Sequence, residues 1–280
     1  MTVLSADGLF LRRGGASLLS GISLSLGPTG SVAVVGPNGA GKSMLLKVLA
    51  GILAPTTGQV RIGDQDLARL SGAARARQIG YLPQYFEPHW DLTVADLVRL
   101  GAERAGNLTT DAAEKVTATF ELAALRGRRW STLSGGERAR LLLAMVLAVD
   151  PPVLLADEPA ASLDIRHRID VVRSLVRRGT DRLCVVVMHD LDLAFRFFEK
   201  VAVTDRGRIV AAGHAQDIFD DDRLDAAFGI RFERLKNGHY SLAAARRLVS
   251  ATATPEWIDG ARSFAWDTDA HASAGVVQRR

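Results

Sequence analysis

Cysteine is almost absent from this chain of 280 residues: the single thiol, Cys184, lies in the apolar run Leu183–Met188. One cysteine cannot form a disulfide within the chain, and a thiol in such a run is typical of a buried, inert side chain. A disulfide-stabilised scaffold is therefore excluded. The composition suits a reducing cytoplasm, where free thiols persist.

Long apolar runs are also missing. The longest, Leu141–Val149, is about half the length that a membrane-spanning helix needs. Residues Met1–Phe10 show no basic stretch followed by an apolar core, so we expect no secretory signal. We therefore expect a protein that acts at a membrane only through a partner.

Neither sign of charge dominates, because 35 basic and 31 acidic residues leave a formal net charge of +4. No run of lysine or arginine carries interleaved aromatic residues, a pattern typical of nucleic-acid surfaces, so we predict no nucleic-acid partner. Hydrophobic residues make up 48% of the chain, which is typical of a globular protein with a sizeable core. The length suits one large α/β domain, or a domain with a subdomain inserted.

The stretch Gly36–Ser43, which reads GPNGAGKS, has the spacing of a phosphate-binding loop. An apolar run before it predicts a buried strand, and an apolar helical stripe follows it. Its glycines let backbone N–H groups approach phosphate oxygens, Lys42 can reach the outer phosphates, and the Ser43 hydroxyl can ligate Mg²⁺. We predict a nucleoside triphosphate site. Its contacting residues in this loop are Gly36, Asn38, Gly39, Ala40, Gly41, Lys42, Ser43 and Met44.

Two carboxylates end another apolar run. Val153–Ala156 predicts a strand, and Asp157 and Glu158 follow it directly. Neighbouring side chains on a strand point to opposite sides, so the two acids cannot do the same work. We predict that Asp157 holds Mg²⁺ and that Glu158 orients or deprotonates an attacking water.

Three more features fit a phosphate site. Leu133–Glu137, which reads LSGGE, precedes a predicted helix at Arg138–Val149, and the N–H groups of a helix start attract anions. His189 and Gln84 each follow a predicted apolar strand. Side chains at the carboxyl ends of strands can point into a shared site, where the Gln84 amide can reach Mg²⁺ or the water.

The pattern changes along the chain. Up to about residue 65 it predicts antiparallel strands, and from 86 onward helices. Thr93 and Asp96 resemble a capping box for a helix at Thr93–Leu100, and Thr110 is predicted to cap a helix at Asp111–Ala124. From Pro152 strands and helices alternate, with a helix predicted at Ile165–Arg178, and this alternation predicts a mostly parallel sheet.

Taken in order, these motifs resemble those of the nucleotide-binding subunit of an ATP-binding cassette (ABC) transporter. The matches are Walker A at Gly36–Ser43, the Q-loop at Tyr81–Gln84, the signature motif at Leu133–Glu137, Walker B at Val153–Pro159, the D-loop at Ala161–Asp164 and the H-loop at His189. The resemblance implies an α/β fold with a RecA-like parallel-sheet core, an N-terminal antiparallel β subdomain and an inserted α-helical subdomain. It also implies ATP and Mg²⁺ as cofactors.

The resemblance spans residues 1–245, which we predict to be the ATP-binding domain, with the helical subdomain at about 86–150. Beyond Ala245 the periodicity fades, and we expect the segment 246–280 to be partly disordered. Trp257, Phe264 and Trp266 in that segment can dock on another surface.

The resemblance further implies an ATPase that works as two copies packed head to tail. ATP on the Walker A loop of one copy would meet Ser134, Gly135 and Gly136 of the other copy in trans. Asp164 would link the two sites across this dimer.

Within one copy, the family pattern assigns the remaining roles. Glu158 would be the catalytic carboxylate, and His189 would steady the γ-phosphate and the water. Gln84 would sense Mg²⁺ and couple the site to a membrane permease.

Three positions depart from the family pattern. Arg13 stands where an aromatic residue usually stacks on adenine, and an arginine can stack on a π-face as well. Met44 replaces a common Thr or Ser, which removes one hydroxyl contact to phosphate. Glu137 replaces a frequent Gln in the signature motif.

The stretch Thr93–Gly101 is similar to the corresponding stretch in ATPases that import metal chelates, which are ferric siderophores, haem or cobalamin. Zinc and manganese importers carry a related stretch, and His89–Asp91 resembles theirs. We therefore expect a separate permease and, indirectly, an extracytoplasmic substrate-binding protein. The ATPase would lie at the cytoplasmic face of the inner (plasma) membrane as a peripheral subunit.

Soluble ABC proteins are the alternatives. The ATPases of chromosome maintenance and DNA repair insert long coiled coils, but Lys42 and Asp157 are only about 115 residues apart, without sustained heptads. The ABC translation factors carry two cassettes, and this chain carries one. A binding module that has lost hydrolysis does not fit, because Glu158 and His189 are both present.

Overall fold

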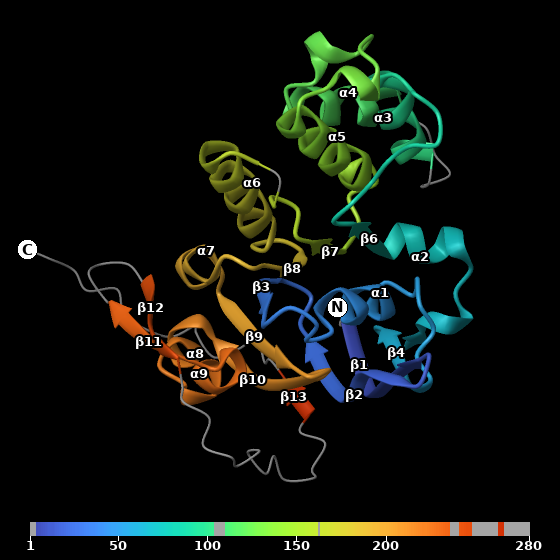
Figure 1. The fold of residues 1–280 in the computed structure, drawn as a ribbon. Helices are drawn as coiled ribbons and strands as arrows, with labels where there is room; N and C mark the ends of the chain where they lie inside the picture. Colours follow the sequence, from blue (N-terminus) through green and yellow to red (C-terminus); the bar gives the residue numbers. More distant parts are fainter. Residues whose placement is uncertain (1–3, 104–109, 162, 236–240, 248–262, 266–280) are drawn as a thin grey trace, which may run out of the picture.

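The computed structural model describes residues 4–103, 110–161, 163–235, 241–247 and 263–265. Within these residues two sheets lie side by side, and a block of helices stands apart from both (Figure 1). This is the predicted α/β architecture, with a parallel-sheet core, an antiparallel N-terminal sheet and a helical insertion.

The first sheet is antiparallel apart from one short edge strand. Its order is β13-β2-β1-β4-β5. The strands are β1 (Leu4–Arg13), β2 (Ala16–Leu26), β4 (Thr57–Ile62), β5 (Gln65–Asp66) and β13 (Ser263–Ala265). β13 runs parallel to β2, with Phe264 opposite Leu24. Residues 263–265 thus pair with this sheet through their backbone, the docking of the aromatic side chains stays a prediction, and Trp257 and Trp266 lie outside the described residues.

The second sheet carries the nucleotide motifs. Its order is β10-β9-β3-β8-β7-β6, and all neighbours are parallel except β10 and β9. The strands are β3 (Gly30–Val35), β6 (Ile79–Leu82), β7 (Val153–Asp157), β8 (Leu183–Val187), β9 (Lys200–Asp205) and β10 (Arg208–His214). β3, β7 and β8 are buried along their whole length, which explains why their sequences are continuous apolar runs.

The helices cover both faces of this sheet and form the separate block. They are α1 (Lys42–Leu49), α2 (Gly72–Gln78), α3 (Val94–Glu103), α4 (Thr110–Thr119), α5 (Gly135–Leu147), α6 (Ile165–Arg178), α7 (Leu191–Phe197), α8 (Ala215–Phe219) and α9 (Asp222–Phe228). A two-stranded sheet pairs β11 (Ile230–Leu235) with β12 (Ser241–Arg247).

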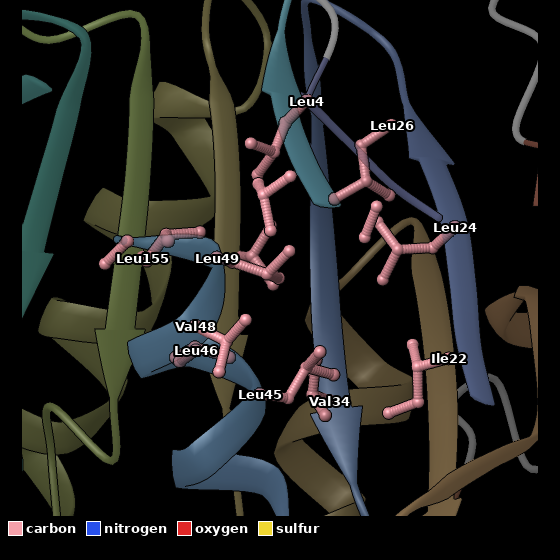
Figure 2. Packing of buried hydrophobic residues seen from close by; sticks show 14 of the residues in the cluster. Leu4, Ile22, Leu24, Leu26, Val34, Leu45, Leu46, Val48, Leu49 and Leu155 are labelled. Carbon is pink, nitrogen blue, oxygen red and sulfur yellow. The ribbon is translucent and has the colours of Figure 1, made fainter. Parts of the chain in front are cut away.

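Two hydrophobic cores share the parallel sheet, because successive side chains on a strand point to opposite faces. On β8, Val185 belongs to the core under α1, and Val186 belongs to the core under α6 and α7. Figure 2 shows the first of these cores, where Leu4 and Leu24 of the antiparallel sheet face Leu49 of α1. The two sheets are thus held together through α1.

The helical block has a core of its own, formed by Val94, Leu97, Val98, Leu122, Trp130, Leu133, Leu141 and Ala144. α3 crosses α5 at Gly101, where an added Cβ would lie 2.4 Å from the carbonyl oxygen of Met145. Glycine therefore sets the close approach of these helices. The domain limits of 1–245, 86–150 and 246–280 stay predictions.

Several predicted ends were wrong. α5 begins at Gly135 rather than Arg138, because Ser134 caps it and forms a capping box with Glu137. α4 includes Thr110 and ends at Thr119, since the chain turns at Glu121, whose φ is 53°. The capping box of Thr93 and Asp96 is present, with α3 running to Glu103.

Candidate functional site

The predicted site residues lie at one edge of the parallel sheet. β3, β8, β7 and β6 are neighbours in that order and run in the same direction. Their carboxyl ends therefore meet, and the segments that follow them converge there. These segments are the Gly36–Ser43 loop after β3, His189 after β8, Glu158 after β7 and Gln84 after β6.

Glycine is required in the Gly36–Ser43 loop by space as well as by backbone angle. An added Cβ at Gly36 would lie 2.2 Å from the carbonyl oxygen of Thr204, and one at Gly41 would lie 2.7 Å from that of Leu18. Gly41 has a φ of 94° and stands at the start of α1 without a side-chain cap. The first N–H groups of α1 are thus left for an anion.

Lys42 is buried inside this loop. Its Nζ donates to the carbonyl oxygens of Gly36 at 2.7 Å and Pro37 at 3.0 Å. Burial lowers the pKa of Lys42, while the carboxylates of Glu158 and Asp157 act in the opposite direction. The ammonium is therefore held against the loop, close to two acids.

Ser43 and Asp157 form the predicted metal-binding pair. The Ser43 hydroxyl donates to Asp157 Oδ1 at 2.9 Å. Burial raises the pKa of Asp157, the Ser43 hydrogen bond opposes this rise, and the charge of Glu158 adds to it. Both side chains offer oxygen, the donor that Mg²⁺ prefers, and Mg²⁺ usually takes one or two protein ligands besides phosphates and waters. The pair therefore fits Mg²⁺.

Tyr81 touches the same carboxylate, a contact that the sequence did not predict. Its hydroxyl donates to Asp157 Oδ2 at 3.5 Å. Burial and the neighbouring charge of Asp157 raise the pKa of Tyr81, so the phenol stays protonated. The pairing of β6 with β7 brings the two residues together, and nothing in the local sequence indicates it.

Glu158 is held through both of its oxygens. Its Oε1 lies 2.6 Å from His189 Nε2, and its Oε2 accepts from the Gln84 amide at 2.8 Å. The side chain is 11% exposed. Its φ of 50° is unusual for a residue with a Cβ and typical of strained functional positions. Among the described residues, no hydrogen bond joins Gln84 to Ser43 or Asp157, so its role as a metal ligand stays a prediction.

The signature residues face outward. Ser134 and Gly135 are exposed at the start of α5, although Gly135 also lines a cleft of about 230 Å³ with Gln84 and Glu158. In the part of the chain that the structure describes, no hydrogen bond or ion pair joins Ser134 to the Gly36–Ser43 loop. One chain thus brings the Gly36–Ser43 loop and the acids together and leaves Ser134 of the predicted second phosphate site exposed.

A family model described as "ABC transporter" matches residues 19–161. This chain belongs to that family. The "Hemin import ATP-binding protein HmuV" of Rhizobium meliloti is 38% identical over 245 residues, which are 82% of this chain and 92% of that protein. The "Cobalamin import ATP-binding protein BtuD" of Halobacterium salinarum is 39% identical over 236 residues. This match spans 81% of the chain but only 59% of the cobalamin protein.

The fold also matches solved cassettes. The dimeric post-hydrolysis structure of an ATP-binding cassette bound to ADP and phosphate aligns with a TM-score of 0.66 at 24% identity, covering 76% of this chain and 98% of that one. Family membership confirms ATP binding and an ATP-hydrolysing enzyme. No helix within the described residues of the cassette is long and apolar enough to cross a membrane.

Three more residues were predicted to contact the nucleotide or the second copy, and they differ in exposure and in what they touch. Arg13 is exposed at the end of β1, and its contact with adenine stays a prediction. The Met44 side chain packs against the core beneath α1, so only its backbone is available to phosphate. Asp164 caps α6 and accepts from the backbone N–H of His167 at 3.0 Å.

Proposed function

We propose that this cassette hydrolyses ATP within a closed homodimer and thereby powers import of a metal chelate through a separate membrane permease. The observation that carries the hydrolysis step is Glu158, fixed between Gln84 and His189 at the end of β7. The chelate cargo rests on the relatives, which are named for hemin and cobalamin import, two metal-bearing macrocycles.

The residues of one chain would bind the nucleotide as follows. The N–H groups of the loop and the start of α1 would cradle the phosphates, and Lys42 would turn from its loop carbonyls to the outer phosphates. Ser43 and Asp157 would hold Mg²⁺, which neutralises phosphate charge when bound. Tyr81 keeps Asp157 oriented from the other side.

The hydrolytic step needs a water with its proton directed to a base. Glu158 would accept that proton, because its carboxylate is held in place and faces the ends of the strands. His189 would keep Glu158 in position and approach the γ-phosphate. Gln84 would sense Mg²⁺ and couple the nucleotide site to the permease. The arrangement supports catalysis by positioning and charge neutralisation.

The second copy would supply Ser134, Gly135 and Gly136. These residues open α5, whose N-terminus attracts anions, and two of them are exposed. Since a single chain leaves them facing outward, a head-to-tail pair would place one such helix start over each nucleotide. Asp164 at the start of α6 would lie between the two sites.

The proposal places the cassette at the cytoplasmic face of the inner membrane, bound to permease subunits and through them to an extracytoplasmic binding protein. A pull-down tests this. The Glu158→Gln variant, carrying an affinity tag, is incubated with native membranes in mild detergent with ATP and Mg²⁺, and retained proteins are identified by mass spectrometry.

We expect the Glu158→Gln variant to retain a polytopic permease together with a chelate-binding protein. The matched control is Lys42→Ala, which should bind no ATP and should retain less permease. Retention of soluble partners alone, despite an ATP-bound dimer, would contradict the transport function. Normal ATP hydrolysis by the Glu158→Gln variant would place the base elsewhere.

A further inference from the structure

Arg168 belongs to none of the motifs described so far, yet it lies beside the hydrolytic residues. It stands in the first turn of α6, four residues after Asp164. It lines a cleft of about 260 Å³ together with Glu158 and His189. A cation that shares a cleft with the base and the histidine is a candidate for a role in the reaction.

The guanidinium of Arg168 connects two separate segments. Its Nη2 donates to the carbonyl oxygen of Leu163 in the D-loop at 3.1 Å. Its Nη1 lies 3.8 Å from Oδ2 of Asp190. The Nε atom is buried, so the stem is packed and the planar head is held between the two segments. Arginine suits this task because its donors point in fixed directions.

Asp190 directly follows His189 in the chain and therefore links Arg168 to His189. Asp190 Oδ1 accepts from the backbone N–H of Leu193 at 3.0 Å and so begins α7. Its other oxygen faces Arg168. With Asp190 fixed from both sides, the backbone at His189 is fixed as well, and His189 Nε2 reaches Glu158 Oε1 at 2.6 Å.

We propose that Arg168 is a positioning residue that ties the D-loop to the start of α7 and thereby holds His189 against Glu158. The inference rests on the proposed hydrolytic roles of Glu158 and His189. Arg168 touches neither of these side chains through a hydrogen bond in the described structure, so it acts through Asp190.

The kinetic test uses Arg168→Met, which keeps the stem and removes the donors. We expect kcat for ATP to fall about tenfold to a hundredfold, because small displacements of catalytic groups cost this much. KM and the Kd for MgATP should stay within about twofold. Arg177→Met is the matched control, because this arginine lies in the last turn of the same helix and is exposed. It should behave as the parent chain.

A double-mutant cycle separates positioning from general support of the fold. If Arg168 acts through His189, Arg168→Met added to His189→Ala should lower kcat no further. Asp190→Asn, which keeps the cap of α7, should lower kcat as Arg168→Met does and should not add to it. If the fold-losses in kcat of the two single variants multiply in the double variant, for either pair, the proposal would be overturned.

A measurement without turnover tests the same geometry. The chain contains six histidines, so ¹⁵N-histidine labelling gives few ring resonances, and His189→Ala assigns the one of interest. Arg168→Met should shift the His189 ring resonances, and Arg177→Met should leave them unchanged. Unshifted His189 resonances in the Arg168→Met variant would overturn the positioning role. An inactive parent chain, in contrast, would overturn the proposed function alone.

Discussion

The Gly36–Ser43 loop and the signature segment are both predicted anion sites at helix starts, but their surroundings in the fold differ. The loop follows β3, a buried strand of the parallel sheet, and Lys42 and Asp157 there are 6% and 2% exposed. The signature segment opens α5 on a separate helical block, with Ser134 and Gly135 exposed. The difference supports the proposal that one chain forms the loop half of the nucleotide site and presents its signature segment to a second copy.

Mixing two inactive variants tests this division most strongly. Lys42→Ala damages the loop and Ser134→Arg blocks the signature segment, so each homodimer should lose at least about a hundredfold in kcat. In a mixed dimer, the intact loop of one chain meets the intact signature segment of the other. Random assortment should restore up to about a quarter of the parent turnover, measured as phosphate release.

The mixture has a simple internal control. Lys42→Ala mixed with Glu158→Gln should stay inactive, because both changes damage the same half of the site and every nucleotide site keeps one defect. A mixture of Lys42→Ala and Ser134→Arg that also stays inactive would show that loop and signature segment act within one chain.

A second prediction concerns the independence of the helical block. Gly101→Ala should destabilise the packing of α3 on α5 by about 1–3 kcal/mol, because the new methyl group meets backbone atoms of Met145. Hydrogen exchange should become faster in α3 and α5, while ATP binding at the loop changes little. Gly72→Ala is the control, since nothing lies within 4 Å of its added Cβ. Equal loss of protection in β3 and α1 would show that the two regions unfold together.

The smallest predicted effect is a change of stability with pH at Asp157. Burial raises its pKa in the folded chain above the value of 3.8 that applies when unfolded. At neutral pH the buried charge therefore opposes folding, and Asp157→Asn should raise the melting temperature while weakening Mg²⁺ binding. The gain should vanish as the pH falls through the raised pKa, because the parent carboxyl then becomes neutral. A gain that persists unchanged below pH 3.8 would rule out the charge as its cause.

Most of the parallel-sheet core could be predicted from the sequence, because β3, β7 and β8 are continuous apolar runs and α6 and α7 begin at capping residues. α6, for example, has the predicted bounds Ile165–Arg178. Elements without such patterns were not predicted. α2 has no buried residue, and β12 of the β11–β12 pair contains Ala245, beyond which the apolar periodicity fades. Helix ends set by tertiary packing, such as the end of α4, were misplaced.

The sequence by itself determined which chemical groups are present and in what order: the glycine-rich loop, the two acids after β7, Gln84, His189 and the signature segment. Spacing along the chain encodes these local features, since strands, caps and glycine turns depend on nearby residues. Only the tertiary structure decided which groups meet. It joined Tyr81 to Asp157, Glu158 to both Gln84 and His189, and Arg168 to Asp190. Each of these contacts joins two segments that are separated in the sequence. The order of strands in the sheet, rather than the local sequence pattern, sets the spatial distance between them.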